Sequence, residues 1–330
     1  MVGGWGIDTA RLAAKRAAVV GYATAVTRTY ADRRRLARMP QRGQALILNL
    51  HSVEPLGRSA VAGIDPRVLD DFVVWLKRHA RIVTIAELAA EDEGRKPCVV
   101  LSFDDGYRDF AVHAMPVLER RGVRANQNII PRCVETGRPP WNVELLDALA
   151  TLPPNRLAGL ADMAGGLRAG LAVAAPARFA ELFTLRLKNQ PRDARRDVLN
   201  AVAERFPELA EARPRPMLSS DEVCQIARDH EVGAHSFAHE SMGLESTDYF
   251  EDDLDRCSAW FDRHGLALRL YAFPNGSYQV EQLAIAAARG IRTLLVDERP
   301  ADPTAQALPR LTMFGRSSLE LRARMAHALK

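Results

Sequence analysis

Two adjacent carboxylates, Asp104 and Asp105, follow the apolar run Cys98–Phe103 and precede Gly106. Neighbouring carboxylates repel each other, so a strand that delivers both into one place needs a compensating cation or a shared proton. The glycine allows a tight turn that lets both side chains face a cleft. The pattern indicates a metal or acid–base centre, although an exposed Asp-Gly turn would read the same way.

A second chemical signal comes from His235 and His239, which are separated by three residues. On a helical turn, this spacing puts both rings on one face, where they can share a metal ion. With a carboxylate they form a facial set that leaves coordination positions open for water and substrate. Either histidine alone is equally compatible with a surface position.

Four further features are compatible with more than one role. His51 ends a short apolar run and can be catalytic or a buried structural histidine. The turn at 274–276 and the side chain of Arg310 can likewise each be functional or purely structural. Trp75 and Trp141 are interpreted as packing residues rather than as binding surfaces for a ligand.

Apolar runs alternate with helical patterns along most of the chain. We expect strands at Ala45–Leu50, Cys98–Phe103, Ala125–Ile130, Glu231–His235, Arg269–Phe273 and Ile291–Val296, and helices at Arg67–His79, Phe110–Arg121, Thr247–His264 and Gln279–Arg289. The pairs Thr84/Glu87 and Ser219/Glu222 are typical of capping boxes that open helices. Such alternation predicts an α/β fold with a parallel sheet, open or closed into a barrel, whose functional residues gather where strands end.

The chain divides into an N-terminal segment and a main domain, and one stretch within the main domain differs in composition. Residues 1–42 form a basic segment predicted to be helical, and 43–330 form the main domain. Residues from about 141 to 216 are rich in Ala, Leu and Arg and predict a helical insertion, with a separate helical domain as the alternative. The stretch Ala17–Val26 weakly imitates a signal peptide, but its many alanines favour a helix.

The bulk composition narrows the class of protein. The 330 residues are 47% hydrophobic and 26% charged, with a net charge of +4. This is globular composition without the concentrated basic face that nucleic acid requires. No stretch approaches the roughly 20 apolar residues of a membrane span. The four scattered cysteines indicate buried fillers in a reducing compartment. We therefore predict a cytoplasmic protein, with peripheral membrane contact through the basic N-terminus as an open alternative.

Together, the motifs resemble those of the polysaccharide deacetylase family, carbohydrate esterase family 4, which shares a NodB-type homology domain. Phe103-Asp104-Asp105-Gly106 matches the family's aromatic-Asp-Asp-Gly block, and His235-Ser236-Phe237-Ala238-His239 matches its His-[Ser/Thr]-x-x-His block. The turn Phe273-Pro274-Asn275-Gly276 is similar to the third motif, with Asn where Tyr is usual. The resemblance extends from about Leu46 to Phe314 and implies a deformed parallel (β/α) barrel of about seven strands.

The resemblance also implies roles for the matched residues. Asp105, His235 and His239 would bind a divalent metal, zinc first, with cobalt, nickel or manganese as alternatives. Asp104 would be the general base for the attacking water, and the backbone N–H of Asn275 would help to hold the oxyanion. This combination suits hydrolysis of an acetamide.

The sequence departs from the family pattern in two places. The Leu-x-His motif that often supplies the general acid is missing, and His51 resembles the histidine that a subgroup places after the first strand. The arginine that usually precedes the third motif is also missing, and Arg310 is the candidate to replace it in orienting Asp104.

The implied function is hydrolysis of N-acetyl groups from a GlcNAc-type sugar in a cell-envelope polysaccharide, lipopolysaccharide or lipid-linked saccharide. Two alternatives stay open. One is a noncatalytic carbohydrate-binding relative, and the other is a deacylase of a non-sugar amide that uses the same metal centre. The sequence does not determine the oligomeric state.

Overall fold

The structure is a computed structural model that describes residues 9–55, 63–88, 96–163, 167–211 and 215–329. Its strands are β1 Leu46–Leu50, β2 Arg81–Ile82, β3 Cys98–Phe103, β4 Asn126–Ile129, β5 Glu231–Ala234, β6 Leu270–Ala272, β7 Arg292–Leu295, β8 Ala307–Pro309 and β9 Leu311–Thr312. Its α-helices are α1 Thr9–Arg28, α2 Ala31–Leu36, α3 Pro66–His79, α4 Met115–Arg120, α5 Pro131–Thr136, α6 Trp141–Leu149, α7 Pro154–Ala158, α8 Ala169–Ala174, α9 Pro176–Lys188, α10 Arg192–Arg205, α11 Ser220–Ile226, α12 Thr247–Arg263, α13 Val280–Ala288 and α14 Ser318–Ala328.

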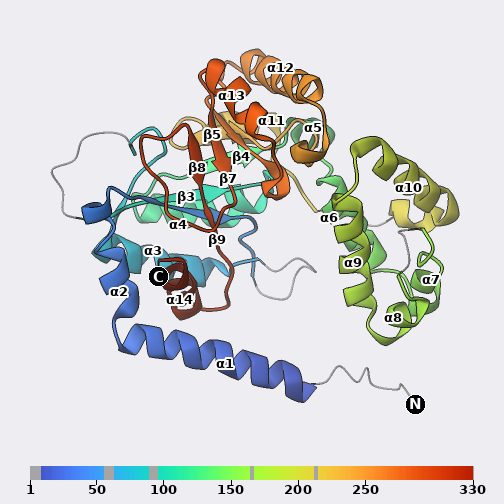
Figure 1. The fold of residues 1–330 in the computed structure, drawn as a ribbon, viewed down its shortest axis with the longest axis horizontal. Helices are drawn as coiled ribbons and strands as arrows, with labels where there is room; N and C mark the ends of the chain where they lie inside the picture. The colour runs from blue at the N-terminus through green and yellow to red at the C-terminus, as the bar shows by residue number, and fades with distance from the viewer. Residues whose placement is uncertain (1–8, 56–62, 89–95, 164–166, 212–214, 330) are drawn as a thin grey trace.

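The strands form one parallel sheet that nearly closes into a barrel (Figure 1). Their order is β8-β7-β6-β5-β4-β3-β1-β9, and the short strand β2 pairs with β3 outside this path. Only Arg310 separates β8 from β9, and these two strands pair with β7 and β1, respectively. The segment 307–312 therefore hydrogen-bonds to both ends of the sheet. Counted as one strand, it completes the barrel of about seven strands that the motifs implied.

Alternation along the strands separates the barrel interior from its outer face. Ile47, Val100, Leu294 and Leu308 belong to one small buried cluster. The flanking residues of β1 and β3 join a larger cluster with the surrounding helices. Alternate residues point to the same side of a strand. Toward the carboxyl ends of β1 and β3, Ile47 and Val100 are therefore followed on the inner side by Asn49, Ser102 and Asp104. An apolar layer thus fills the barrel toward the amino ends of the strands, and polar groups occupy the end where the strands terminate.

The register between β1 and β3 aligns two of the candidate residues. Leu50 is paired with Phe103, and the N–H of Asp104 donates to the carbonyl of Leu50. His51 and Asp104 therefore leave their strands at the same level. The predicted strands agree with β1 and β3–β7 within one residue at each end, because each was bounded by clear turn or polar residues.

Two predicted helices differ from the structure. The segment predicted as Phe110–Arg121 begins as a π-helix over Phe110–Ala114 and becomes α-helical only from Met115. Pro116 has no N–H to donate to the preceding turn, which accounts for the altered winding. Thr84 and Glu87 exchange both capping hydrogen bonds, but residues 85–88 form turns, and 89–95 lie outside the described residues. The Ser219/Glu222 capping box opens α11 as expected.

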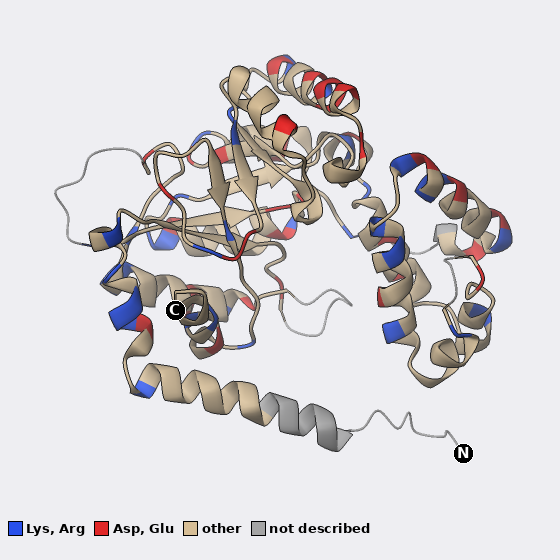
Figure 2. Cartoon of the chain, in the orientation of Figure 1, with Lys and Arg blue, Asp and Glu red and all other residues tan. Residues whose placement is uncertain are grey.

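Between Trp141 and Glu211, every regular element in the described residues is a helix, and turns connect these helices. Helices α6–α10 lie beside the barrel and share their own buried cluster, which includes Leu149, Phe179, Phe183 and Val202 (Figure 1). These helices carry charges of both signs on their surfaces, as Figure 2 shows for α10. We refer to residues 141–211 as the helical insertion.

The N-terminal segment is helical from Thr9, and residues 1–8 lie outside the described residues. Ala23 and Val26 of α1 pack on Ala323 and Ala326 of α14. Buried Asp32 of α2 forms an ion pair with Arg322, with 2.6 Å between Oδ2 and Nη2. No helix in the described part of the chain is long and apolar enough to cross a membrane. The four cysteines are free thiols that are buried or half-buried.

Candidate metal centre and catalytic cleft

The turn after β3 presents the two carboxylates in different directions. Asp105 adopts a left-handed backbone conformation with φ of 76°, and Gly106 follows with φ of 74°. A Cβ atom at Gly106 would lie 3.3 Å from the Ile129 side chain, so the position favours glycine for space as well as conformation. A left-handed aspartate is strained, and such strain is concentrated at functional sites.

Asp105 meets the two motif histidines in the barrel mouth. Its Oδ1 atom lies 3.5 Å from His235 Nε2 and 3.6 Å from His239 Nε2. One ligand atom from each of the three residues lies within 4.8 Å of the other two, and all three residues are buried. Asp105 Oδ1 has no hydrogen-bond partner among the described residues. An orphaned carboxylate oxygen facing two imidazole nitrogens fits the donor set of a divalent metal ion.

The protonation of the histidines suits metal binding. His235 Nδ1 lies 2.9 Å from the carbonyl oxygen of Ala272, so a proton on Nδ1 leaves the Nε2 lone pair facing Asp105. Burial lowers the pKa of His239 to about 3 despite the nearby Asp105, so its imidazole is neutral at physiological pH. For Asp105, burial favours the neutral acid, but the charge of nearby His51 is the largest opposing effect, and the pKa is lowered.

The two histidines do not share a helical turn, and that part of the prediction is wrong. They lie on an irregular loop after β5, in which Ser236 and His239 have φ of 60° and 61°. Buried Asp253 of α12 holds this loop by accepting hydrogen bonds from Ser236 Oγ and the Phe237 N–H, each at 3.0 Å. Two left-handed residues, rather than a helix, bring the rings to a centroid separation of 5.1 Å.

Asp104 is anchored by the side chain of Arg310. Arg310 Nη1 and Nη2 donate to the two carboxylate oxygens at 2.7 and 2.8 Å, and both residues are almost fully buried. Burial alone would raise the pKa of Asp104, but Arg310 reverses this effect and holds the pKa well below its usual value. Asp104 is therefore ionised. Arg310 reaches it from the junction of β8 and β9, where the barrel closes.

A buried polar network extends from this ion pair into the barrel. Asn128 Nδ2 donates to Asp104 Oδ1 at 2.8 Å, and Arg310 Nη1 donates to Ser102 Oγ at 3.1 Å. Ser102 Oγ in turn donates to Asn126 at 2.7 Å. Because the interior is shielded from water, this network holds the carboxylate rigidly.

His51 and Asn275 complete the candidate set and line the same cleft. His51 is half-buried and lies close enough to Asp104 and Asp105 to lower the pKa of both carboxylates. Asn275 has φ of 58° within the 274–276 turn, and its side chain donates to Ser241 Oγ at 3.0 Å. Asparagine tolerates this conformation better than most residues. The structure thus brings all seven sequence-derived site residues to one end of the barrel.

The cleft has a volume of about 590 Å³ and is bounded by the barrel and by the helical insertion. The barrel supplies its floor, and α6 and α9 of the insertion supply one wall through residues such as Leu146, Thr184 and Lys188. Burial lowers the pKa of Lys188. This lysine forms no ion pair with the residues that the structure describes. Exposed Phe314 and Leu185 add apolar surface at the cleft.

Several residues that support the site were not predicted from the sequence. Asn126, Asn128 and Ser102 are polar residues inside buried strands, and this pattern could have indicated a buried polar network. Asp253 lies on the apolar face of α12, together with Phe250, Leu254 and Cys257, and this position could also have been recognised from the helical spacing. Lys188 had no such signal, because only the packing of the insertion brings it to the cleft. Trp75 is buried against Phe72, as predicted for a packing residue, whereas half-buried Trp141 lines a second pocket.

Comparison with protein families yields one match. Residues 198–294 match the family model described as polysaccharide deacetylase. The matched region covers less than half of the chain but includes His235, His239 and Asn275. No curated protein sequence matches the chain.

Solved structures with the same fold cover most of the chain. A deacetylase from Streptococcus pyogenes, PplD in complex with acetate, has a TM-score of 0.55 at 15% identity, covering 84% of this chain and 96% of its own. IcaB from Ammonifex degensii has a TM-score of 0.52 at 16% identity, covering 86% and 97%. BC0361, a polysaccharide deacetylase from Bacillus cereus, has a TM-score of 0.55 at 10% identity, covering 87% and 69%. The family model confirms the resemblance to polysaccharide deacetylases, and the shared barrel confirms the fold that this resemblance implied.

Proposed function

We propose that this protein is a metal-dependent deacetylase that hydrolyses the N-acetyl group of a GlcNAc-type sugar in a cell-envelope polysaccharide, lipopolysaccharide or lipid-linked saccharide. The observation that carries the proposal is the set formed by Asp105, His235 and His239, with ligand atoms within 4.8 Å of one another. This set lies beside an ionised carboxylate, Asp104, in a cleft large enough for a sugar unit.

Asp105, His235 and His239 would hold the metal, with zinc as the first choice because it favours nitrogen-rich sites with an open position. When bound, such an ion polarises the acetamide carbonyl and makes water more acidic. The orphaned Oδ1 of Asp105 and the neutral imidazole of His239 support this assignment.

Asp104 would accept the proton of the attacking water. Its Oδ1 already accepts hydrogen bonds from Arg310 and Asn128, whereas Oδ2 accepts one, from Arg310, among the described residues. Oδ2 therefore keeps a lone pair that can take a proton. Arg310 would act through Asp104 by fixing its orientation and keeping it ionised between turnovers.

The remaining steps need an oxyanion donor and an acid. As water oxygen bonds to the carbonyl carbon, negative charge develops on the carbonyl oxygen, and the backbone N–H of Asn275 would donate to it. The C–N bond then breaks, and His51 would donate a proton to the departing amine. The products are acetate and the free amino sugar.

Acetate release from a panel of substrates tests the proposal. The protein is freed of metal with a chelator, reloaded with Zn²⁺, Co²⁺, Ni²⁺ or Mn²⁺, and incubated with N-acetylated oligosaccharides and small amides. We expect acetate from at least one saccharide, only in reloaded protein. Saccharide binding without acetate release would instead support the noncatalytic alternative, and acetate from the amides alone would support a non-sugar deacylase.

A further inference from the structure

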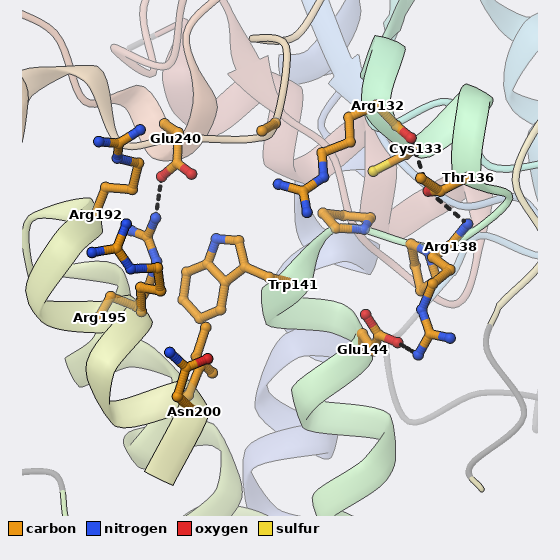
Figure 3. Close-up of a pocket in the computed structure, with 15 residues that line it drawn as sticks. Arg132, Cys133, Thr136, Arg138, Trp141, Glu144, Arg192, Arg195, Asn200 and Glu240 are labelled. Atoms are coloured by element: carbon orange, nitrogen blue, oxygen red, sulfur yellow. Dashed lines mark hydrogen bonds and ion pairs between the residues drawn. The ribbon is translucent and has the colours of Figure 1, made fainter. Parts of the chain in front are cut away.

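A second pocket, with a volume of about 550 Å³, lies outside the catalytic cleft. It is formed by α5, the start of α6, α10 and the loop that carries His239 (Figure 3). Its lining includes five arginines: Arg132, Arg138, Arg192, Arg195 and Arg196. We call it the arginine pocket.

The arginine pocket has a surplus of positive charge. Its two acidic lining residues are already engaged, because Glu144 pairs with Arg138 and buried Glu240 pairs with Arg195. Arg132 has no carboxylate partner among the described residues.

The other two arginines of the pocket share one acid. Arg192 and Arg196 both contact exposed Asp193, each at 3.2 Å, and Asp193 does not line the pocket. Guanidinium groups bind carboxylate and phosphate oxygens through paired hydrogen bonds. The lining therefore favours an anionic ligand.

Trp141 supplies a flat apolar surface within this charged lining. Figure 3 shows its indole between Arg195 and Arg132 in this view, and Pro139 and Pro140 line the pocket beside it. The guanidinium of Arg195 lies 4.6 Å from the indole centroid, which fixes the ring. A small inorganic anion needs neither an aromatic surface nor this volume, whereas a sugar ring uses both.

We propose that the arginine pocket is a second saccharide-binding site that takes an acidic sugar, a ring that carries a carboxylate or a phosphate group. The pocket and the cleft lie on different faces of α6, because Trp141 and Glu144 line the pocket and Asn142 and Val143 line the cleft. Glu240 directly follows His239 in the chain, so the two sites share one loop. The binding itself does not depend on the proposed deacetylase chemistry.

Equilibrium binding to the full-length protein tests this site. The probes are an oligogalacturonate and glucose 6-phosphate, compared with inorganic phosphate and with a neutral maltooligosaccharide, which carries no N-acetyl group for the catalytic cleft. Binding is measured by calorimetry and by tryptophan fluorescence. We expect at least one acidic sugar to bind about tenfold or more tightly than both comparison ligands, and to bind more weakly as salt rises. Tighter binding of the oligogalacturonate would indicate a carboxylate ligand, and tighter binding of glucose 6-phosphate would indicate a phosphate ligand. Equal affinity for inorganic phosphate, or no binding of either acidic sugar, would overturn the proposal.

Matched variants locate the binding. Arg132→Ala and Arg196→Ala remove exposed arginines of the pocket and should each weaken binding about tenfold, while Trp141→Phe should remove the fluorescence change. Arg228→Ala, an exposed arginine outside both sites, should leave binding unchanged. Asp104→Asn should also leave it unchanged, which separates a failure here from a failure of the proposed chemistry. Unaltered affinity in both pocket variants would contradict the assignment.

Discussion

The barrel mouth and the helical insertion hold their charged residues in different ways. In the barrel, Asp104 and Arg310 are nearly inaccessible and joined by two hydrogen bonds within a network of buried polar side chains. In the insertion, most ion pairs are exposed, such as Arg178 with Glu181, whose side chains are 61% and 55% accessible. Buried networks fix geometry, whereas exposed charges remain available to ligands. The barrel is thus suited to chemistry and the insertion to recognition.

The two regions meet at the loop that carries His239. Buried Arg195 of α10 pairs with Glu240, and the N–H of Arg192 donates to Glu245 at 2.7 Å. Ser241 Oγ donates to the carbonyl of Lys188 at 3.1 Å. The insertion therefore contacts the loop at three points directly after a metal-binding candidate. The arginine pocket and the candidate metal centre are therefore connected through this loop.

The largest expected effect is on the chemistry of the barrel. Asp104→Asn keeps the size of the side chain but removes the proton acceptor, and should lower acetate release by about 100-fold to 10,000-fold. Steady-state acetate release from the best saccharide measures this loss. Asp71→Asn, an exposed carboxylate of α3 outside the cleft, is the control and should retain full activity. Undiminished release by Asp104→Asn would show that Asp104 is not the base.

The next effect concerns the stability of the buried ion pair. Arg310→Met leaves Asp104 buried without its cation and should lower the free energy of unfolding by about 3–5 kcal/mol. Arg178→Ala, which breaks an exposed pair of the insertion, should cause no measurable change. Denaturant titration of both variants compares the two regions directly. Equal losses of unfolding free energy in the two variants would mean that the barrel and the insertion do not differ in how strongly their ion pairs stabilise the protein.

The acid sensitivity of the metal-free protein should reflect His239. Burial lowers its pKa to about 3 in the folded state, whereas an unfolded histidine titrates near 6.5. The unfolded chain thus binds the proton first as pH falls, and the folded state loses stability below about pH 6.5 and until about pH 3. From pH 7 to pH 5 this group should contribute a loss of about 2 kcal/mol.

Denaturant titrations of wild type and His239→Gln at both pH values isolate that contribution. The variant lacks the titrating group, so its loss of stability between pH 7 and pH 5 should be smaller by this amount. Identical pH dependence in the two proteins would mean that His239 is not a buried neutral imidazole.

The smallest effect is expected at the 274–276 turn. Asn275 has φ of 58°, so Asn275→Ala should cost about 1 kcal/mol of stability, while Asn275→Gly should cost less. Thermal unfolding of both variants measures the difference. If the backbone N–H holds the oxyanion, Asn275→Gly should also retain most of the deacetylase activity. Alanine proving as stable as glycine would indicate that the turn relaxes.

The sequence predicted the barrel well because strand ends and motif residues coincide. Asp104-Asp105 and His235 each follow a strand whose apolar run was unambiguous. The path of the His235–His239 loop was not predictable, because left-handed residues at Ser236 and His239 leave no mark in a spacing rule. The contact between Arg310 and Asp104 could only be guessed, since it depends on where the last strand closes the barrel. Lys188 and the arginine pocket arise from packing of the insertion and required the structure.

The metal content of the protein at equilibrium shows most directly whether Asp105, His235 and His239 hold an ion. Chelator-treated protein is titrated with Zn²⁺ and analysed by calorimetry and elemental analysis, beside Asp105→Ala, His239→Ala and the control Asp71→Asn. We expect one tightly bound ion per chain in wild type and control, and a loss of affinity of about 100-fold or more in the two site variants. An ion that binds the site variants as tightly as wild type, or no tight binding to wild type, would contradict it.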